Sequence, residues 1–166
     1  MQMNANRRFV FNMMSRALLA AGAAFLPSAG AALLMNESAA ARSIGITSLI
    51  CLIVGGAGRV CAGAVRDAVR PRIWYMTTFF IWLMICVVTV PAYYFGMPGS
   101  AFEDAVLSSC AGWTTTGICV FESELVPASI SLLRATCSWL GGIGIIMVIL
   151  TLVPSRQFIG WGLAST

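Results

Sequence analysis

The chain has 166 residues, of which 59% are hydrophobic and 10% are charged, and its formal net charge is +4. Soluble domains are about half apolar and about one quarter charged, so this composition excludes a soluble globular class and indicates an integral membrane protein. All ten basic residues are arginine, and the sequence contains neither lysine nor histidine. Because histidine is the usual general base and the commonest metal ligand, we expect no enzyme, no catalytic residues and no cofactor. The arginines flank apolar runs, as membrane topology requires, so we expect no nucleic-acid partner.

The first part of the chain predicts two membrane spans. Three arginines within residues 1–16 precede an uncharged run at residues 17–35, which we interpret as a retained first span rather than a signal peptide because it is long and contains Pro27. Residues 43–65 form the second expected span. An arginine-rich connector follows, so we expect residues 1–72 to be an N-terminal transmembrane helix pair with a basic cytoplasmic connector.

A third expected span covers residues 73–97 and is long enough to cross a hydrocarbon core of about 30 Å. Aromatic residues stand at both of its ends, where membrane helices carry interfacial belts. They are Trp74 and Tyr75 at one end, and Tyr93 and Tyr94 at the other.

A shorter helix is predicted over residues 100–113, after the turn-forming pair Pro98 and Gly99. Ser100 and Glu103 have the spacing of a capping box, with serine at the cap and glutamate three positions later. A helix of this length cannot cross a bilayer and is typical of a re-entrant or interfacial segment. A hydroxyl-rich turn at residues 114–118 follows, and the last expected span, residues 128–153, ends before Pro154.

Charge distribution predicts the orientation of these spans. With the N-terminus inside, eight of the ten arginines lie on the inner side, as the positive-inside rule requires. The re-entrant segment then enters from the outside. Its outer rim is acidic and would concentrate cations; the rim residues are Glu103, Asp104, Glu122 and Glu124.

The turn carries the chemistry that we consider functional. Irregular backbone at membrane depth persists only where it is buried in protein or lines a water-filled cavity. A cation that sheds its water needs oxygen ligands in place of that water, and potassium channels supply backbone carbonyls. Thr114, Thr115, Thr116, Gly117 and Ile118 meet this demand in outline; the alternative is a threonine-rich loop that binds no ion.

From about residue 72 to residue 154 the chain resembles the TrkH/KtrB (Trk/Ktr/HKT) superfamily of potassium uptake proteins. The resemblance is carried by the segments FEDA at 102–105, SCAGWTTTG at 109–117, LLR at 132–134 and WLGGIGI at 139–145. The two earlier spans resemble the extra N-terminal helix pair of the TrkH branch.

The resemblance implies an all-α integral membrane fold in which the N-terminal pair precedes one pore unit of a potassium-channel-like protein. That unit covers residues 73–156, with outer helix 73–97, pore helix 100–113, filter 114–118 and inner helix 128–153; residues 157–166 would be a truncated tail. Ion coordination is carried over first onto Thr115 and Thr116, and then onto Thr114, Gly117 and Ile118.

The same resemblance implies a location in the bacterial inner membrane, with potassium as the transported substrate. It also implies a dimer, and a cytosolic nucleotide-binding regulatory subunit as a partner. Family members carry four pore units in one chain, whereas this sequence contains one. We favour a fragment that supplies one of four filter quadrants; a homotetrameric cation channel and a truncated, non-conducting homologue or interaction module are the alternatives.

Arg134 and a glycine cluster in the last expected span allow two interpretations each. We expect Arg134 to pair with an acidic rim residue and hold the return segment, rather than to tune the field near the filter. Gly141, Gly142 and Gly144 would permit close helix packing, with a hinge as the alternative. The rim carboxylates could also suggest an acid–base enzyme, but they lack a nucleophilic partner.

Overall fold

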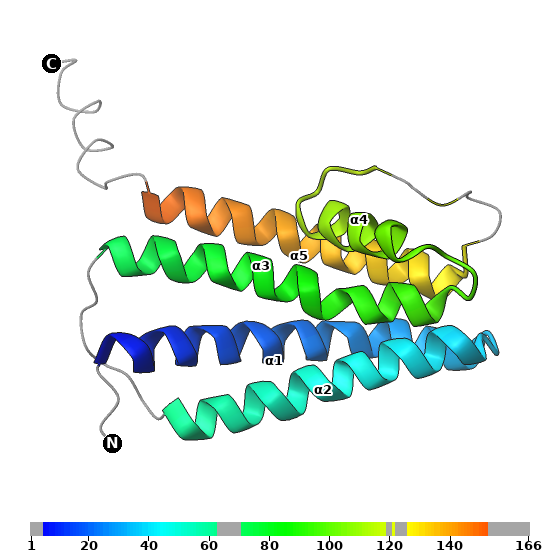
Figure 1. Cartoon of the computed structure of the whole chain (residues 1–166), viewed down its shortest axis with the longest axis horizontal. Coiled ribbons are helices and arrows are strands. Elements are labelled where there is room, and N and C mark those ends of the chain that lie inside the picture. Colours follow the sequence, from blue (N-terminus) through cyan, green and yellow to red (C-terminus); the bar gives the residue numbers. More distant parts are fainter. Residues whose placement is uncertain (1–4, 63–70, 119–120, 122–125, 153–166) are drawn as a thin grey trace, which may run out of the picture.

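The structure, a computed structural model, describes residues 5–62, 71–118, 121 and 126–152. Its elements in chain order are α1 (Ala5–Leu34), α2 (Ser38–Ala62), α3 (Pro71–Gly96), α4 (Phe102–Trp113) and α5 (Ala128–Leu152), and the described residues contain no strand. The four long helices run alternately in opposite directions, and α4 lies beside the end of α3 and the start of α5 (Figure 1).

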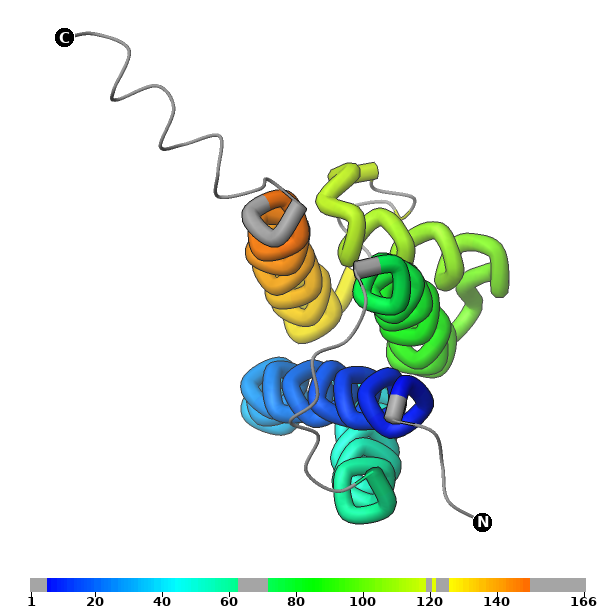
Figure 2. Tube along the Cα trace, turned by 90° about the vertical axis from the view of Figure 1, so that its left-hand side faces the viewer, coloured from blue at the N-terminus to red at the C-terminus, as the bar shows by residue number. Residues whose placement is uncertain are grey.

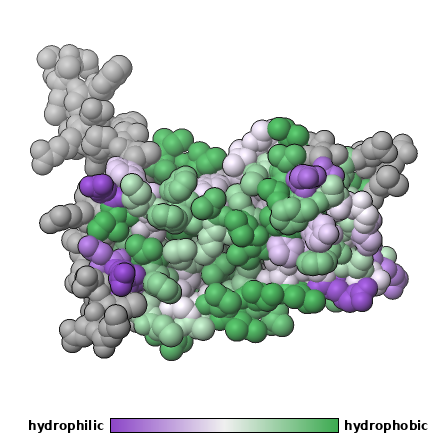
Figure 3. Space-filling model, in the orientation of Figure 1, coloured by the Kyte–Doolittle hydropathy of each residue, from purple (hydrophilic) through white to green (hydrophobic). Residues whose placement is uncertain are grey.

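Four of these helices are long and apolar enough to cross a membrane. In each of them, between 17% and 33% of the most apolar stretch is buried within the chain. A space-filling view shows the consequence, an apolar band across the middle of the molecule with hydrophilic residues near both ends (Figure 3). Such a band is the surface expected of a multi-pass membrane protein, whose apolar side chains face lipid or further protein.

The N-terminal helix pair packs tightly and α1 occupies the centre. Seen end-on, α1 lies between α2 on one side and α3 and α5 on the other (Figure 2). The hydroxyl of Ser48 on α2 donates to the carbonyl of Gly22 on α1 at 2.7 Å. A side chain at Gly55 would meet the backbone of Ser15 at 2.9 Å, so glycine lets these helices approach closely.

Helix α1 begins earlier than the sequence suggested. We expected the first helix to start at residue 17, whereas it starts at Ala5 and includes the arginines before the apolar run. Arginine is a good helix former, and no glycine or proline interrupts residues 5–16. Pro27 lies inside α1 without ending it.

Two expectations about α3 and α4 are wrong. The N-cap of α4 is Ala101, in extended conformation and with no side-chain cap hydrogen bond, so the capping box at Ser100 does not form. Gly99, at φ +95°, turns the chain so that the Ser100 hydroxyl is buried instead. Tyr93 is 1% exposed and packs in the core, whereas Tyr94 is 38% exposed and Trp74 42%, as an interfacial position requires.

Candidate functional site

The short helix α4 is fixed to α3 by buried side-chain hydrogen bonds. At about 1.5 Å per residue its 12 residues extend about 18 Å, which is too short to cross a bilayer. The Ser109 hydroxyl donates to the Cys86 carbonyl at 2.7 Å, and the Trp113 indole nitrogen donates to the Thr89 hydroxyl at 2.9 Å. These bonds set the depth of the C-terminal end of α4 along α3.

The C-terminal end of α4 packs against a glycine of α5. A Cβ atom added at Gly141 would collide with the carbonyl oxygen of Trp113 and lie 2.9 Å from its carbonyl carbon. Gly142, one position on, has only the Thr115 methyl group nearby, at 3.8 Å, while Gly144 faces the Trp82 ring at 3.1 Å. The packing interpretation is therefore confirmed at Gly141 and Gly144.

The chain leaves α4 through a tight turn with a strained threonine. The Thr115 amide donates to the Gly112 carbonyl at 3.2 Å, and the Thr116 amide donates to the Ala111 carbonyl at 3.1 Å. This pair of bonds is the Schellman pattern, which normally places glycine in the left-handed position. Here the position holds Thr115, with φ at +56°, and a β-branched residue rarely adopts that conformation.

The three threonine hydroxyls form hydrogen bonds within the turn. Thr114 donates to the Cys110 carbonyl at 2.7 Å, and its oxygen lies 2.7 Å from the Thr116 hydroxyl. Thr115 donates to the Thr114 carbonyl at 2.7 Å. Residues 114–118 are all exposed in the single chain. The turn is thus held in shape locally while its outer side remains accessible.

Arg134 of α5 reaches the last two carbonyls of the turn. Its guanidinium donates to the carbonyl of Gly117 at 3.0 Å and also to that of Ile118. Gly117 has φ +76°, a conformation that glycine adopts without strain. The guanidinium is directed at these backbone oxygens and not at Glu103 or Asp104. The other two expected partners, Glu122 and Glu124, lie outside the described residues, so the expected pairing with the acidic rim stays a prediction for them.

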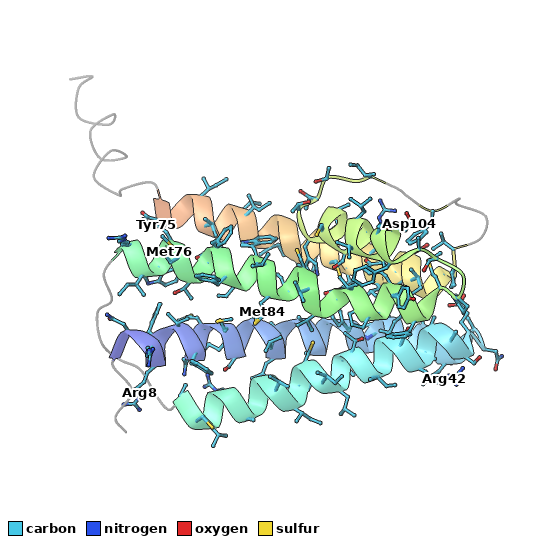
Figure 4. All side chains as sticks on the ribbon, viewed as in Figure 1. Arg8, Arg42, Tyr75, Met76, Met84 and Asp104 are labelled. Carbon is cyan, nitrogen blue, oxygen red and sulfur yellow. The ribbon has the colours of Figure 1, made fainter. Side chains whose placement is uncertain are left out.

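The acidic rim is described only in part. Glu103 and Asp104 lie in the first turn of α4, near the positive end of that helix's dipole. Glu122 and Glu124 lie outside the described residues. In side-chain view, Asp104 and Arg42 lie toward one end of the molecule and Arg8 toward the other (Figure 4).

Sequence reasoning missed the structural role of Glu37, in the turn between α1 and α2. Its carboxylate accepts hydrogen bonds from the Ala128 amide at 2.9 Å, the Ser129 amide at 3.2 Å and the Ser129 hydroxyl. It therefore caps α5 from 91 positions away. One signal existed: residues before α5 offer no serine, threonine or aspartate at the cap, so its first amides need a distant acceptor.

The cap also changes the acidity of Glu37. Burial raises the pKa of this carboxyl, but the hydrogen bonds from Ser129 and Ala128 together outweigh burial and hold the pKa below its ordinary value. Hydrogen bonds to the ionised form are the cause, since the amides and the hydroxyl all donate to the carboxylate.

A small polar cavity of about 60 Å³ lies near Arg134, between α3, α4 and α5. Two of its lining hydroxyls, Tyr93 and Ser108, are each 1% exposed, and the Ser108 hydroxyl has no hydrogen-bond partner among the described residues. A cavity of this size, lined by hydroxyls and a guanidinium, has room for a water that would bond to Ser108. No cluster of potential metal-ligating side chains occurs in the described part of the chain.

Comparisons with known proteins give two partial similarities. The chain is 34% identical over 77 residues to an uncharacterized cation transporter of Methanocaldococcus jannaschii, covering 46% of this chain and 16% of that protein. It is 29% identical over 103 residues to the Trk system potassium uptake protein TrkH of Halomonas elongata, covering 61% of this chain and 21% of that protein. No family model matches, and no solved structure matches.

The chain thus spans about one fifth or less of the length of these curated relatives. Both relatives are named as cation transporters, and the second is a potassium uptake protein. The chain is a multi-pass membrane protein, helical in its described elements, and over part of its length it is similar to a cation transporter and to a Trk system potassium uptake protein.

Proposed function

We propose that the chain takes part in potassium translocation across a membrane, and that residues 114–118 coordinate the ion. The single observation that carries this proposal is the strained turn at the C-terminal end of α4, with Thr115 and Gly117 both at positive φ. Non-glycine residues persist in such conformations where the surroundings impose them, and they cluster at functional sites. Positive φ at every second residue, as at Thr115 and Gly117, lets a backbone direct successive carbonyls to one side.

The position of the turn supports coordination of a cation. Helix α4 ends at Trp113, so its partially negative end is adjacent to Thr114. The chain enters α4 and starts α5 at the same end of the molecule, which supports a re-entrant pore helix that dips into the bilayer and returns (Figure 1). Within such a segment, backbone carbonyls replace the hydration shell of potassium.

One turn supplies only a quarter of a ring of carbonyls. We therefore infer that the chain contributes one of four filter quadrants, completed by further pore units or by further copies of this chain. Residues 114–118 are exposed and the spans are little buried, so polar surface at the turn and apolar surface on the spans remain for such neighbours. The resemblance to Trk proteins, whose members carry four pore units in one chain, is the reason to prefer further units over a homotetramer.

Charge distribution supports the proposed orientation in the membrane. Arginines 7, 8, 16, 59 and 72 lie toward one end of the long helices, and Glu37, Glu103 and Asp104 toward the other. With the arginine-rich end cytoplasmic, the acidic rim and the turn open to the outside of a bacterial inner membrane. A dimer and a cytosolic nucleotide-binding regulator remain proposals that rest on the resemblance to Trk proteins.

The test is complementation of a strain that lacks potassium uptake, grown on limiting potassium. The chain is expressed alone and, where its reading frame continues, as the full product. We expect growth from the form that completes the filter. Gly117→Ser should weaken growth and relax selectivity toward sodium, because serine is strained at φ +76°.

The matched control is Gly99→Ser, since Gly99 also has positive φ, at +95°, but lies before α4. It should leave selectivity unchanged. Failure of both forms to rescue, with normal membrane expression, would contradict the proposed function and favour the non-conducting alternative.

A further inference from the structure

A lateral groove of about 780 Å³ runs between α2 and α3, away from the threonine turn. Its lining includes no residue of α4, α5 or the turn. Ligand sites commonly have volumes of about 300–1,000 Å³, largely apolar walls and a few polar groups. The groove has these properties, and nothing in the proposed transport role uses it.

Small residues on α2 create the groove. Ala39, Ser43 and Thr47 recur at helical spacing, and Ser43 and Thr47 are 6% and 3% exposed at its floor. The Ser43 hydroxyl donates to the Ala92 carbonyl on α3 at 3.1 Å, which joins the two helices beneath the floor. Apolar walls stand on both sides and are open laterally: Ile46 is 58% exposed, and Phe95 is 64% exposed.

The groove has the length of one leaflet. Its α2 side extends from Ala39 to Ile50, 11 residues apart, which is about 16 Å at 1.5 Å per residue. Half of a hydrocarbon core of about 30 Å is nearly the same distance. The groove begins near Pro98, at the end of the molecule that carries the acidic residues, and ends at Ile50, halfway along α2.

An arginine stands at the polar mouth of this apolar groove. Arg42 is exposed, and its Nε donates to the Ser38 carbonyl at 3.1 Å. Among the described residues no carboxylate pairs with it: the neighbouring Glu37 is engaged with α5. Of the described arginines only Arg42, near the start of α2, and Arg134, near the start of α5, lie toward the acidic end. Arg134 is bound to the turn.

We propose that the groove binds one anionic phospholipid, with an acyl chain between α2 and α3 and the phosphate against Arg42. The guanidinium fits a phosphate because its donors form a planar fork that can contact two oxygens at once. The apolar walls exclude a polar occupant from the rest of the groove, and the one-leaflet length fits a single acyl chain. This site is independent of ion transport, because it depends only on α2 and α3.

The test uses the whole chain purified in mild detergent and titrated with phosphatidylglycerol or phosphatidylcholine, with bound lipid measured by native mass spectrometry. We expect saturable binding of one phosphatidylglycerol per chain. Arg42→Gln should weaken it about tenfold, while Arg59→Gln, on the same helix but outside the groove, should leave it unchanged.

A second pair of variants tests the acyl-chain position. Ile46→Trp should obstruct the groove and abolish binding, whereas Ile53→Trp, equally exposed on α2 but outside the groove, should not. Equal effects of Arg42→Gln and Arg59→Gln would overturn the proposal, because they would indicate general surface attraction. It would also be overturned if Ile46→Trp bound lipid normally, or if Ile46→Cys crosslinked two chains through the groove.

Discussion

Thr115 is the residue at which the backbone conformation of the turn is energetically unfavourable. Left-handed backbone disfavours an L-residue by roughly 1–2 kcal/mol, and glycine avoids this cost. Thr115→Gly should therefore raise the free energy of unfolding by about 1 kcal/mol, although it removes the hydroxyl that donates to Thr114. Thermal unfolding in detergent measures the change.

Thr116 supplies the comparison for Thr115, because its φ is not positive. Thr116→Gly should lower the free energy of unfolding by about 0.4–1 kcal/mol, since glycine only adds freedom to the unfolded chain. Equal destabilisation by the two glycine variants would show that Thr115 is not strained.

Arg134 holds the distal half of the turn through the Gly117 and Ile118 carbonyls. Arg134→Leu should loosen this segment, because two backbone oxygens lose charged donors. Amide hydrogen exchange over residues 114–118 should accelerate several-fold. Arg42→Leu is the control, since Arg42 does not contact the turn, and similar acceleration in both variants would contradict this role.

At the scale of elements, the contact between α4 and α5 depends on Gly141. Gly141→Ala should destabilise the protein by about 1–3 kcal/mol, because the added methyl group collides with the Trp113 backbone. Gly142→Ala should be neutral or stabilise by up to about 1 kcal/mol, since its new methyl group meets ordinary contact distances and alanine favours the helix. Thermal unfolding of both variants measures the two effects. A Gly141→Ala variant as stable as the unmodified chain would mean that α4 does not pack against α5.

The N-terminal pair is coupled to α5 through Glu37, and this coupling should depend on pH. The folded-state pKa of Glu37 is lowered from 4.5, so its contribution is present above that pH and is lost as the pH falls through the folded value. Glu37→Gln should lower thermal stability at neutral pH, and the difference from the unmodified chain should shrink under acid conditions. Glu103→Gln is the control, and a pH-independent difference for Glu37→Gln would contradict the cap.

At the scale of the whole molecule, the four spans and the short fourth helix were predictable because the lengths of apolar runs carry that information. The position of the hydroxyl-rich turn in the sequence was predictable, since Gly117 and the threonines before it disfavour a regular helix. The hydrogen bonds that shape the turn were not predictable from the sequence. The acidic rim was the expected partner of Arg134, yet the fold brings backbone carbonyls within its reach.

Long-range pairs account for the other misses. The cap of α5 by Glu37 joins residues 91 positions apart, so no local pattern identified the acceptor. Tyr93 and Tyr94 are adjacent residues of the same type, so the sequence does not tell them apart. The way α3 is rotated about its axis against its neighbours buries Tyr93 and exposes Tyr94. Ser100 had the spacing of a cap, and the turn at Gly99 moved the helix start one residue later.

The central claim is that residues 114–118 coordinate potassium as part of a four-part filter. The most direct measurement is the potassium-to-sodium permeability ratio of liposomes containing whichever form of the protein restores growth. We predict a ratio well above one, falling toward one in Gly117→Ser and unchanged in Gly99→Ser. Equal ratios in all three proteins would contradict the assignment of this turn as the ion-selective site.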